Sequence, residues 1–135
     1  MINFILSNYT LSDFISRLNV ARRKHLKSII IKPSRIVFSL LKIFEEMGII
    51  RGYMMLEDYN IEVLLKYGNS RCAFSDLKVV SKPSRRVYAD MLTLRKLKEI
   101  YASDVLVIST SDGIMLDVDC LKYNKVGLVL LRIVF

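Results

Sequence analysis

Apolar residues recur at helical spacing in two stretches of the N-terminal half. The segment Thr10-Leu-Ser-Asp13 has the spacing of a capping box, and the apolar positions that follow predict a helix from about Leu11 to Arg23. Ser34 precedes a second periodic stretch, which ends at Gly48. Serine is a preferred helix N-cap and glycine a common helix stop, so a second amphipathic helix is predicted between them.

Three shorter apolar runs in this half have the composition of strands. Ser28 to Lys32 is rich in β-branched residues and ends at a proline. Ile49–Leu56 and Ile61–Tyr67 are separated by the four polar residues Glu57-Asp-Tyr-Asn60, which favours a hairpin. The small and polar residues Gly68-Asn-Ser-Arg71 then indicate a hinge.

The C-terminal half has fewer helical signals. A short helix is predicted over Leu92–Ile100, with Leu94, Leu97 and Ile100 facing inward. Leu77–Val80, Val105–Ser109 and Leu128–Val134 read as strands. The fold predicted is α+β in two small lobes: an N-terminal helix-strand-helix-hairpin lobe at residues 1–68, and a mostly β lobe with a short helix at 69–135.

The charge of the chain indicates a polyanionic partner. The 135 residues carry a formal net charge of +8, and basic residues cluster around Arg17–Arg35 and again around Lys78–Lys98. A solvated face that serves only solubility is the alternative. The longest apolar run, Val126 to Leu131, is too short to span a bilayer, and neither a signal nor a transit peptide is apparent. Two cysteines and one histidine match no metal spacing, so no cofactor is expected.

Two polar segments have the chemistry of an RNA contact. In Val107-Ile-Ser-Thr-Ser-Asp-Gly-Ile-Met115, three consecutive hydroxyl residues and Gly113 form what reads as a tight loop after a strand, suited to ribose 2′-hydroxyls. Tyr88 follows Lys82, Ser84, Arg85 and Arg86, so an aromatic face could stack on a base while cations meet phosphates. A half-buried strand aromatic is the other interpretation of Tyr88.

Catalytic interpretations have weaker support in the residues. Ser109 would need a base, and the only histidine, His25, lies in the other half. Asp112, Asp117 and Asp119 could bind a hard cation, but acids in a basic chain more often balance Lys and Arg. A small basic RNA-processing enzyme that uses Asp117 or Asp119 with Ser109 therefore stays open as the alternative, as does a protein-interaction module.

Taken together, these segments resemble the bacterial-type small-subunit ribosomal protein eight family over nearly the full chain. The hydroxyl segment is similar to that family's signature of two aliphatics, Ser-Thr, two variable residues, Gly and two aliphatics. Val79-Val-Ser-Lys-Pro-Ser-Arg-Arg-Val-Tyr88 resembles a second family motif, and Lys32-Pro-Ser34 with Lys42–Ile50 resembles a third. Asp13 and Arg17 match the first helix of the family.

The resemblance implies a non-enzymatic protein that binds the central domain of small-subunit rRNA and supports its assembly. The implied partners are this rRNA and neighbouring small-subunit proteins, among them protein five, with no membrane and no small-molecule substrate. The hydroxyls would approach the RNA minor groove, Tyr88 would stack, and the cations would meet phosphate. The RNA-binding residues expected are Arg17, Lys32, Ser34, Lys82, Ser84, Arg85, Arg86, Tyr88, Ser109, Thr110, Ser111, Gly113 and Gly127.

Departures from the family pattern suggest a relaxed rRNA interface. Asp112 stands where the family commonly has Lys, Leu128 where it usually has Glu, and Ser84 where it has Gly. The chain is also rich in Ile, Leu, Phe, Tyr, Lys and Asn and lacks Trp, as in AT-biased genomes. These features favour the ribosome of a mitochondrial matrix, with a bacterial cytoplasm or a plastid as alternatives.

Overall fold

The computed structural model describes residues 2–82 and 84–135, with side chains from residue 10 onward. It divides into two compact units, Met1–Ser75 and Asp76–Phe135. Each unit combines helices with an antiparallel sheet, which confirms the α+β class. The predicted boundary at Gly68 falls inside the first unit, because Gly68 and Arg71 pair across the tight turn between β4 (Tyr67–Gly68) and β5 (Arg71–Cys72).

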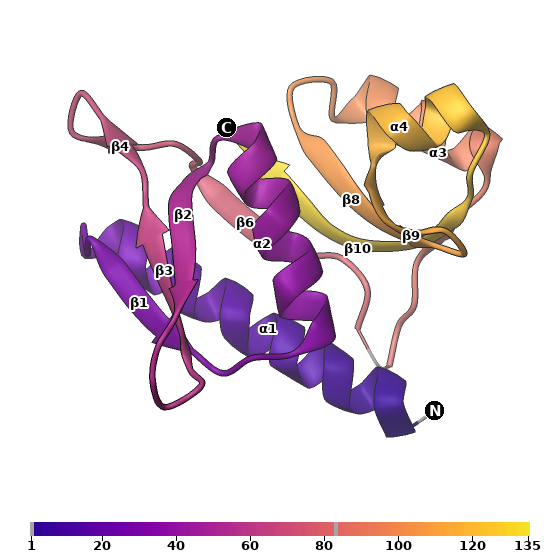
Figure 1. Ribbon diagram of the computed structural model, residues 1–135. Helices are drawn as coiled ribbons and strands as arrows, with labels where there is room; N and C mark the ends of the chain where they lie inside the picture. Colours follow the sequence, from indigo (N-terminus) through magenta and orange to yellow (C-terminus); the bar gives the residue numbers. More distant parts are fainter. Residues whose placement is uncertain (1, 83) are drawn as a thin grey trace. The chain divides into compact units, whose positions relative to one another are not determined.

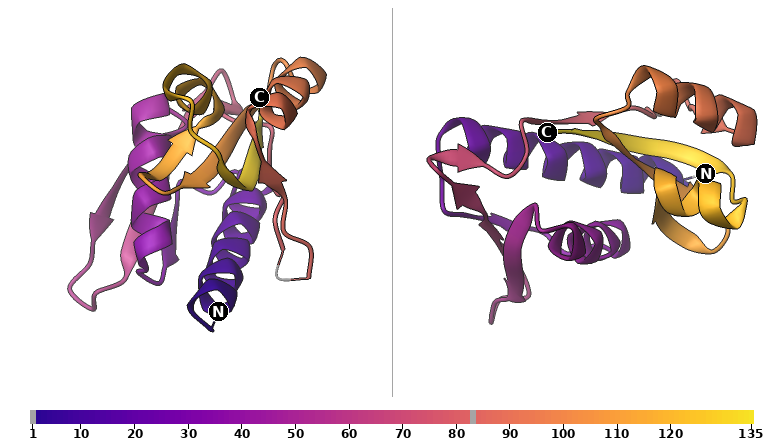
Figure 2. Two further views of the ribbon diagram at one scale, coloured as in Figure 1. Left: turned by 90° about the vertical axis from the view of Figure 1, so that its right-hand side faces the viewer. Right: turned by 90° about the horizontal axis from the view of Figure 1, so that it is seen from above.

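The first unit packs two helices on one side of a three-stranded sheet (Figures 1 and 2). Its strands β1 (Ser28–Ile31), β3 (Ile61–Leu65) and β2 (Ile50–Met55) lie in the order β1-β3-β2. The helices are α1 (Ile2–Arg23) and α2 (Arg35–Met47), and their core contact includes Phe14 stacked on Phe44 with ring centroids 6.2 Å apart. This confirms the predicted order of helix, strand, helix and hairpin.

The ends of α2 follow the sequence signals, whereas the start of α1 does not. Ser34 caps α2, because its Oγ accepts a hydrogen bond from the Val37 N–H at 3.2 Å, and Gly48 ends the helix with φ +78°. The predicted cap at Thr10 is wrong, since α1 already begins at Ile2. No Gly or Pro precedes Thr10, so nothing in the sequence stops the helix from extending toward the N-terminus.

The second unit is a five-stranded sheet with two helices on one face (Figure 1). β6 (Asp76–Val79), β10 (Gly127–Val134), β8 (Val105–Thr110) and β9 (Gly113–Leu116) are neighbours in that order, and β7 (Tyr88–Ala89) also pairs with β10. The helices α3 (Met91–Ile100) and α4 (Asp117–Tyr123) cover a core cluster of Ala89, Leu94, Leu106, Ile108, Cys120 and Val129.

Three details of this unit differ from the sequence prediction. Strand β9 and helix α4 were not predicted, so the unit holds two short helices rather than one. Ile100, expected to face inward, is 70% exposed at the last turn of α3. The hydroxyl segment is the end of a β8–β9 hairpin rather than a loop, because β8 continues through Thr110.

Candidate RNA interface

Four side chains of the second unit line up across neighbouring strands. In the sheet register, Tyr88 on β7 lies opposite Leu128 on β10, Leu128 opposite Ser109 on β8, and Ser109 opposite Ile114 on β9. Cross-strand partners project from the same face of a sheet. We call this line of Tyr88, Leu128, Ser109 and Ile114 the cross-strand row.

The cross-strand row lies on the face of the sheet that the helices leave uncovered. Its neighbours in sequence, among them Ala89, Ile108 and Val129, belong to the core cluster under α3 and α4. Successive strand residues alternate between faces, so the row points the other way. Tyr88 is 64% exposed, which shows that its ring is a surface aromatic and not a core residue.

The three consecutive hydroxyls do not project as one group. Ser109 and Thr110 are adjacent residues of β8, so their side chains leave opposite faces of the sheet. The Thr110 hydroxyl donates to the Gly113 carbonyl oxygen at 2.8 Å and accepts from the Asp112 N–H at 3.2 Å. Thr110 therefore closes the hairpin turn, while Ser111 is exposed at its tip and Ser109 is half-buried in the row.

The two glycines of the predicted set have different environments. Gly113 has φ +110° and open space around the position of a side chain, so the turn conformation is what favours glycine there. A Cβ at Gly127 would lie 2.0 Å from the Ser109 carbonyl oxygen. Gly127 is thus required by the close approach of β10 to β8, a role inside the sheet that the sequence did not reveal.

Asp112 at the hairpin tip forms an ion pair with Lys125. The Lys125 Nζ lies against the Asp112 carboxylate, which offsets the negative charge next to Ser111. A carboxylate in place of the family's Lys repels phosphate, and the pairing of Asp112 with Lys125, just before β10, reduces that repulsion.

The basic residues that the sequence predicted to meet phosphate in this unit lie on a short hairpin-like loop. The Lys82 N–H donates to the Arg85 carbonyl at 2.9 Å, and the Arg85 N–H donates to the Lys82 carbonyl at 3.0 Å. The side chains of Lys82, Ser84, Arg85 and Arg86 are all exposed. We call residues 82 and 84–86 the basic loop; Val87 follows it, and then Tyr88 of the cross-strand row.

Ser81 anchors the base of the basic loop, a role that sequence reasoning missed. Its side chain is fully buried, and its hydroxyl donates to the Val129 carbonyl and accepts from the Val87 N–H at 3.0 Å. Val129 stands at the irregularity in β10 where pairing passes from β7 to β6. Ser81 thus fills the gap that the bulge leaves in the ladder.

Asp90 caps the helix that follows Tyr88 in the chain. Its carboxylate accepts the Thr93 N–H at 2.7 Å and caps α3. This bond to the Thr93 backbone, with help from the Thr93 side chain and Lys96, holds the pKa of Asp90 below its usual value. Tyr88 is therefore held between the Ser81 anchor and the start of a helix.

The predicted residues of the first unit form a separate group. Arg17 Nε lies 3.2 Å from Asp13 Oδ2, and an Arg17 terminal nitrogen donates to the Ile30 carbonyl at 3.0 Å. Lys32 is exposed, and together with Arg17 and Pro33 it lines a hollow at the end of β1. Ser34, as described, caps α2. Lys32 is thus the member of this group whose cation is most available.

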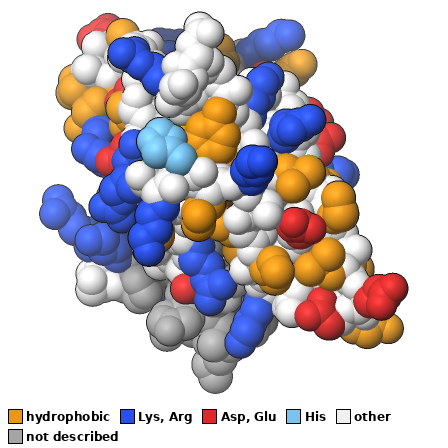
Figure 3. Space-filling view, turned by 90° about the vertical axis from the view of Figure 1, so that its left-hand side faces the viewer, with side chains coloured by type: hydrophobic (Ala, Val, Ile, Leu, Met, Phe, Trp, Pro, Cys, Tyr) orange, Lys and Arg blue, Asp and Glu red, His pale blue; other side chains and the backbone are white. Residues whose placement is uncertain are grey.

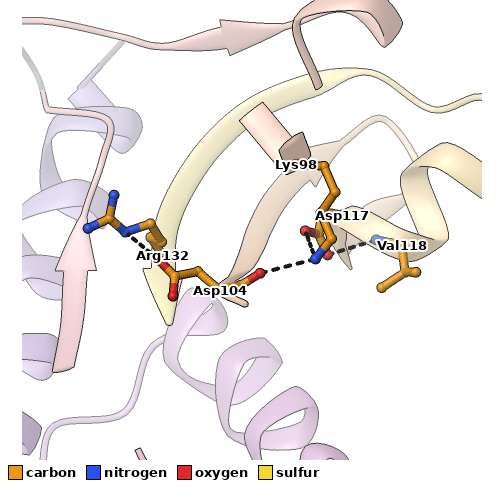
Figure 4. A network of polar contacts seen from close by, with 5 residues as sticks. All are labelled: Lys98, Asp104, Asp117, Val118 and Arg132. Atoms are coloured by element: carbon orange, nitrogen blue, oxygen red, sulfur yellow. Dashed lines mark hydrogen bonds and ion pairs between the residues drawn. The ribbon is translucent and has the colours of Figure 1, made fainter. Parts of the chain in front are cut away.

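Asp117, one of the two acids of the catalytic alternative, lies in a structural network (Figure 4). Asp117 is fully buried; its Oδ2 lies 3.0 Å from Lys98 Nζ, and its Oδ1 accepts the Val118 N–H. Lys98 also donates to the Asp104 carbonyl, and Asp104 pairs with Arg132 at 3.2 Å. This network joins α3 to α4 and to β10, and it leaves no exposed carboxylate at Asp117 to assist Ser109.

Among the side chains that the structure describes, no group of His, Cys, Asp and Glu is arranged to hold a metal ion. Both cysteines are free thiols, Cys120 buried and Cys72 half-buried. Burial, with Asp117 and Asp119 nearby, raises the pKa of the Cys120 thiol, as expected for a core residue and not for a nucleophile. None of the described helices is long and apolar enough to span a membrane.

Comparison with known proteins decides the family. The model of ribosomal protein S8 matches residues 9–135. The chain belongs to the ribosomal protein S8 family. This confirms the resemblance drawn from the sequence motifs, and with it a structural rather than an enzymatic protein.

Individual relatives match over almost their full lengths. Small ribosomal subunit protein uS8m of Acanthamoeba castellanii is 32% identical over 123 residues, which cover 91% of this chain and 97% of that protein. Small ribosomal subunit protein uS8 of Campylobacter hominis is 32% identical over 127 residues, with 91% and 95% covered. The uS8 of Nautilia profundicola is 31% identical over 132 residues, with 95% and 99% covered.

Proposed function

We propose that this chain is a structural protein of the small ribosomal subunit that binds the central domain of its rRNA, chiefly through the second unit. The proposal rests on the cross-strand row and the basic loop that precedes it, which together hold an exposed tyrosine ring, the half-buried Ser109 and several exposed cations. Stacking and phosphate contacts together are the means by which proteins hold splayed RNA nucleotides.

Each element of this surface has a distinct role in the proposal. The Tyr88 ring stacks on a base, and Ser109 and Ser111 contact ribose hydroxyls in the minor groove. Lys82, Arg85 and Arg86, with Ser84 beside them, contact phosphate, and Lys32 and Arg17 add a contact from the first unit. Thr110 and Gly113 shape the hairpin that presents Ser111, and Gly127 brings β10 close enough to β8 to align the row.

Leu128 gives the interface of this chain an apolar centre. It lies between Tyr88 and Ser109 in the row and is 8% exposed. An aliphatic side chain offers neither a donor nor an acceptor, so the RNA surface above it would be a ribose or base face that makes van der Waals contact. In the middle of the row, van der Waals contact with Leu128 therefore takes the place of a hydrogen bond.

We further infer that the ribosome concerned is mitochondrial and that protein five is among the neighbours. The match to uS8m of Acanthamoeba castellanii supports the first inference, together with the departures at Leu128 and Ser84. The neighbour rests on the family resemblance alone. Isolation of ribosomes from mitochondria and from the surrounding cytosol, followed by peptide identification, would test the compartment.

Salt-dependent binding of the full chain to a central-domain rRNA fragment tests the proposed function. If about six phosphates are engaged, affinity should fall roughly a thousandfold between low and moderate salt. Replacing Lys82 and Arg85 by Ala should reduce the slope of log affinity against log salt by about two. The matched control replaces Lys24 and Lys27, two exposed lysines of the first unit outside the predicted set.

Comparing the two double variants shows whether RNA affinity depends on the basic loop in particular or only on the net positive charge of the chain. We expect the control to retain most of the affinity and slope. Absence of binding at low salt, or equal losses in both double variants, would overturn the proposal that the basic loop positions the RNA.

A further inference from the structure

The outer face of the first unit's sheet exposes apolar side chains. Ile30 on β1 and Met54 on β2 both lie opposite Glu62 on the central strand β3, so the three side chains form one line across the face away from the helices. Ile30 is 52% exposed and Met54 is 49% exposed. Such a face is usually polar in a monomer, because only one side of this sheet has a core to cover.

The apolar surface continues onto the tip of the β2–β3 hairpin. Tyr59 at this tip is 74% exposed. The turn is ordered by hydrogen bonds: the Leu56 N–H donates to the Asn60 carbonyl at 2.8 Å, and the Asn60 side chain donates to the Asp58 carboxylate at 2.9 Å. The tip therefore presents its side chains in a fixed arrangement, which lowers the entropy cost of binding.

The charge on this surface is opposite to that of the whole molecule. Glu57, Asp58 and Glu62 are interspersed with the apolar side chains, and none of them forms an ion pair with a described Lys or Arg. In a chain of net charge +8 they form a local acidic region. Figure 3 shows acidic and hydrophobic side chains close together toward one end of the face.

This combination fits a protein and not a polynucleotide. Carboxylates repel phosphate, whereas Lys and Arg of a partner can pair with them around an apolar contact. Methionine side chains adapt to irregular partners. β2 is also an edge strand, whose outward peptide groups are free to bond an extended segment.

We propose that Ile30, Met54 and Tyr59, with Glu57, Asp58 and Glu62, form a docking surface for a basic segment of a neighbouring protein in the particle. Lys or Arg of that segment pairs with the three carboxylates, and its apolar side chains cover Met54 and Ile30. The ribosomal setting comes from the proposed function. The docking surface belongs wholly to the first unit, whereas the cross-strand row and the basic loop belong to the second.

Site-specific photocrosslinking in the assembled particle tests this docking surface. The full chain carries p-benzoylphenylalanine in place of Met54 and is assembled with rRNA and the other small-subunit proteins. The control carries it in place of Ile100, which is also apolar and exposed but lies on α3. We expect the residue 54 probe to crosslink to a peptide of a small-subunit protein that contains Lys or Arg, with at least fivefold higher yield than the control.

Charge reversal provides the second arm of the test. Glu57→Lys combined with Asp58→Lys should lower the crosslink yield from residue 54 at least fivefold, whereas Glu99→Lys, on exposed α3, should not. Thermal unfolding verifies that each variant is folded. Crosslinks from residue 54 to rRNA, no crosslink at all, or a yield unaffected by charge reversal would overturn the docking surface.

The same charge-reversal variant distinguishes loss of protein docking from loss of RNA binding. The doubly reversed chain should bind the central-domain rRNA fragment as tightly as the parent chain or more tightly, because it removes two negative charges and adds two positive ones. If the parent chain failed to bind the fragment, the proposed RNA contact would fall, but a basic peptide crosslinked at residue 54 would still support the docking surface.

Discussion

Tyr88 is the single side chain on which the proposed RNA contact depends most. Its ring is exposed, its backbone is paired with Leu128, and it lies between the Ser81 anchor and the Asp90 cap. Tyr88→Ala should weaken binding to the rRNA fragment by about 1 to 3 kcal/mol, as expected for lost stacking, with little change in stability. Tyr88→Phe keeps the ring and should bind nearly as well. Unchanged affinity in Tyr88→Ala, measured by filter binding, would remove the ring from the interface.

Gly113 provides a test of backbone conformation at the hairpin tip. Its φ of +110° is unfavourable for any side chain, although a Cβ there would meet no atom within 4 Å. Gly113→Ala should therefore destabilise the chain by about 1 to 3 kcal/mol through strain alone. Gly68→Ala is the matched control, because Gly68 has equal space without the positive φ. Equal midpoints for both variants in urea unfolding would contradict the strain argument.

Single residues also mark the limit of sequence reasoning. The pattern of Lys, Arg and Tyr in residues 82–88 indicated an exposed basic and aromatic surface, and the structure exposes those side chains. The role of Ser81 was not predictable, because it depends on where an irregularity falls in β10, a strand almost fifty residues away. A buried serine and an exposed serine look the same in a sequence.

At the scale of elements, Ser81 makes the basic loop part of the sheet. Ser81→Ala would leave the Val87 N–H without this partner and take a donor from the Val129 carbonyl. The expected loss is about 1 to 3 kcal/mol of unfolding free energy. RNA affinity should fall as well, because the loop that carries Lys82 and Arg85 loosens. Ser84→Ala, in the same loop but exposed, should leave stability unchanged; a loss of stability equal to that of Ser81→Ala would refute the anchor.

Tyr67 links β4 to the connection between α1 and β1 and makes stability depend on pH. Its hydroxyl donates to the Leu26 carbonyl at 2.5 Å. Burial first, and then Cys72, raises the pKa of Tyr67 above its ordinary value, although Arg22 opposes the shift. The raised pKa means that this stabilisation is complete below pH about 10 and is lost as pH rises through the higher folded value.

The Tyr67 contribution can be measured by urea unfolding at a series of alkaline pH values. Tyr67→Phe should cost about 1 kcal/mol near neutral pH and should lose less further stability above pH about 10 than the parent chain does. Tyr59→Phe, at an exposed ring, serves as the control and should follow the parent profile. Parallel profiles for Tyr67→Phe and the parent would exclude Tyr67 as the titrating group.

Elements with local signals were predicted well, and those that depend on packing were not. Ser34 and Gly48 define α2 through their own backbone bonds, which act within a few residues. Helix α4 begins at Asp117, and Leu116 before it makes no side-chain cap bond, so the sequence lacks the usual capping residue for this helix. It forms because its Asp117 and Cys120 are buried in the second unit, an effect of tertiary packing.

At the scale of the whole molecule, each unit contributes a different kind of surface. The second unit supplies the cross-strand row and the basic loop, and the first supplies Lys32 and the acidic and apolar docking surface. Net charge alone predicted a polyanionic partner but not the division of surfaces. That division depends on which residues the strand register places side by side, and register is not visible in composition.

A density map of the assembled small subunit, at a resolution that shows side chains, would reveal whether the cross-strand row binds rRNA. We expect the Tyr88 ring to stack on a nucleotide, Ser109 and Ser111 to lie within hydrogen-bond distance of ribose oxygens, and the basic loop to lie beside phosphates. A map in which Tyr88 and both serines face another protein or solvent, with no nucleotide in contact, would contradict this expectation.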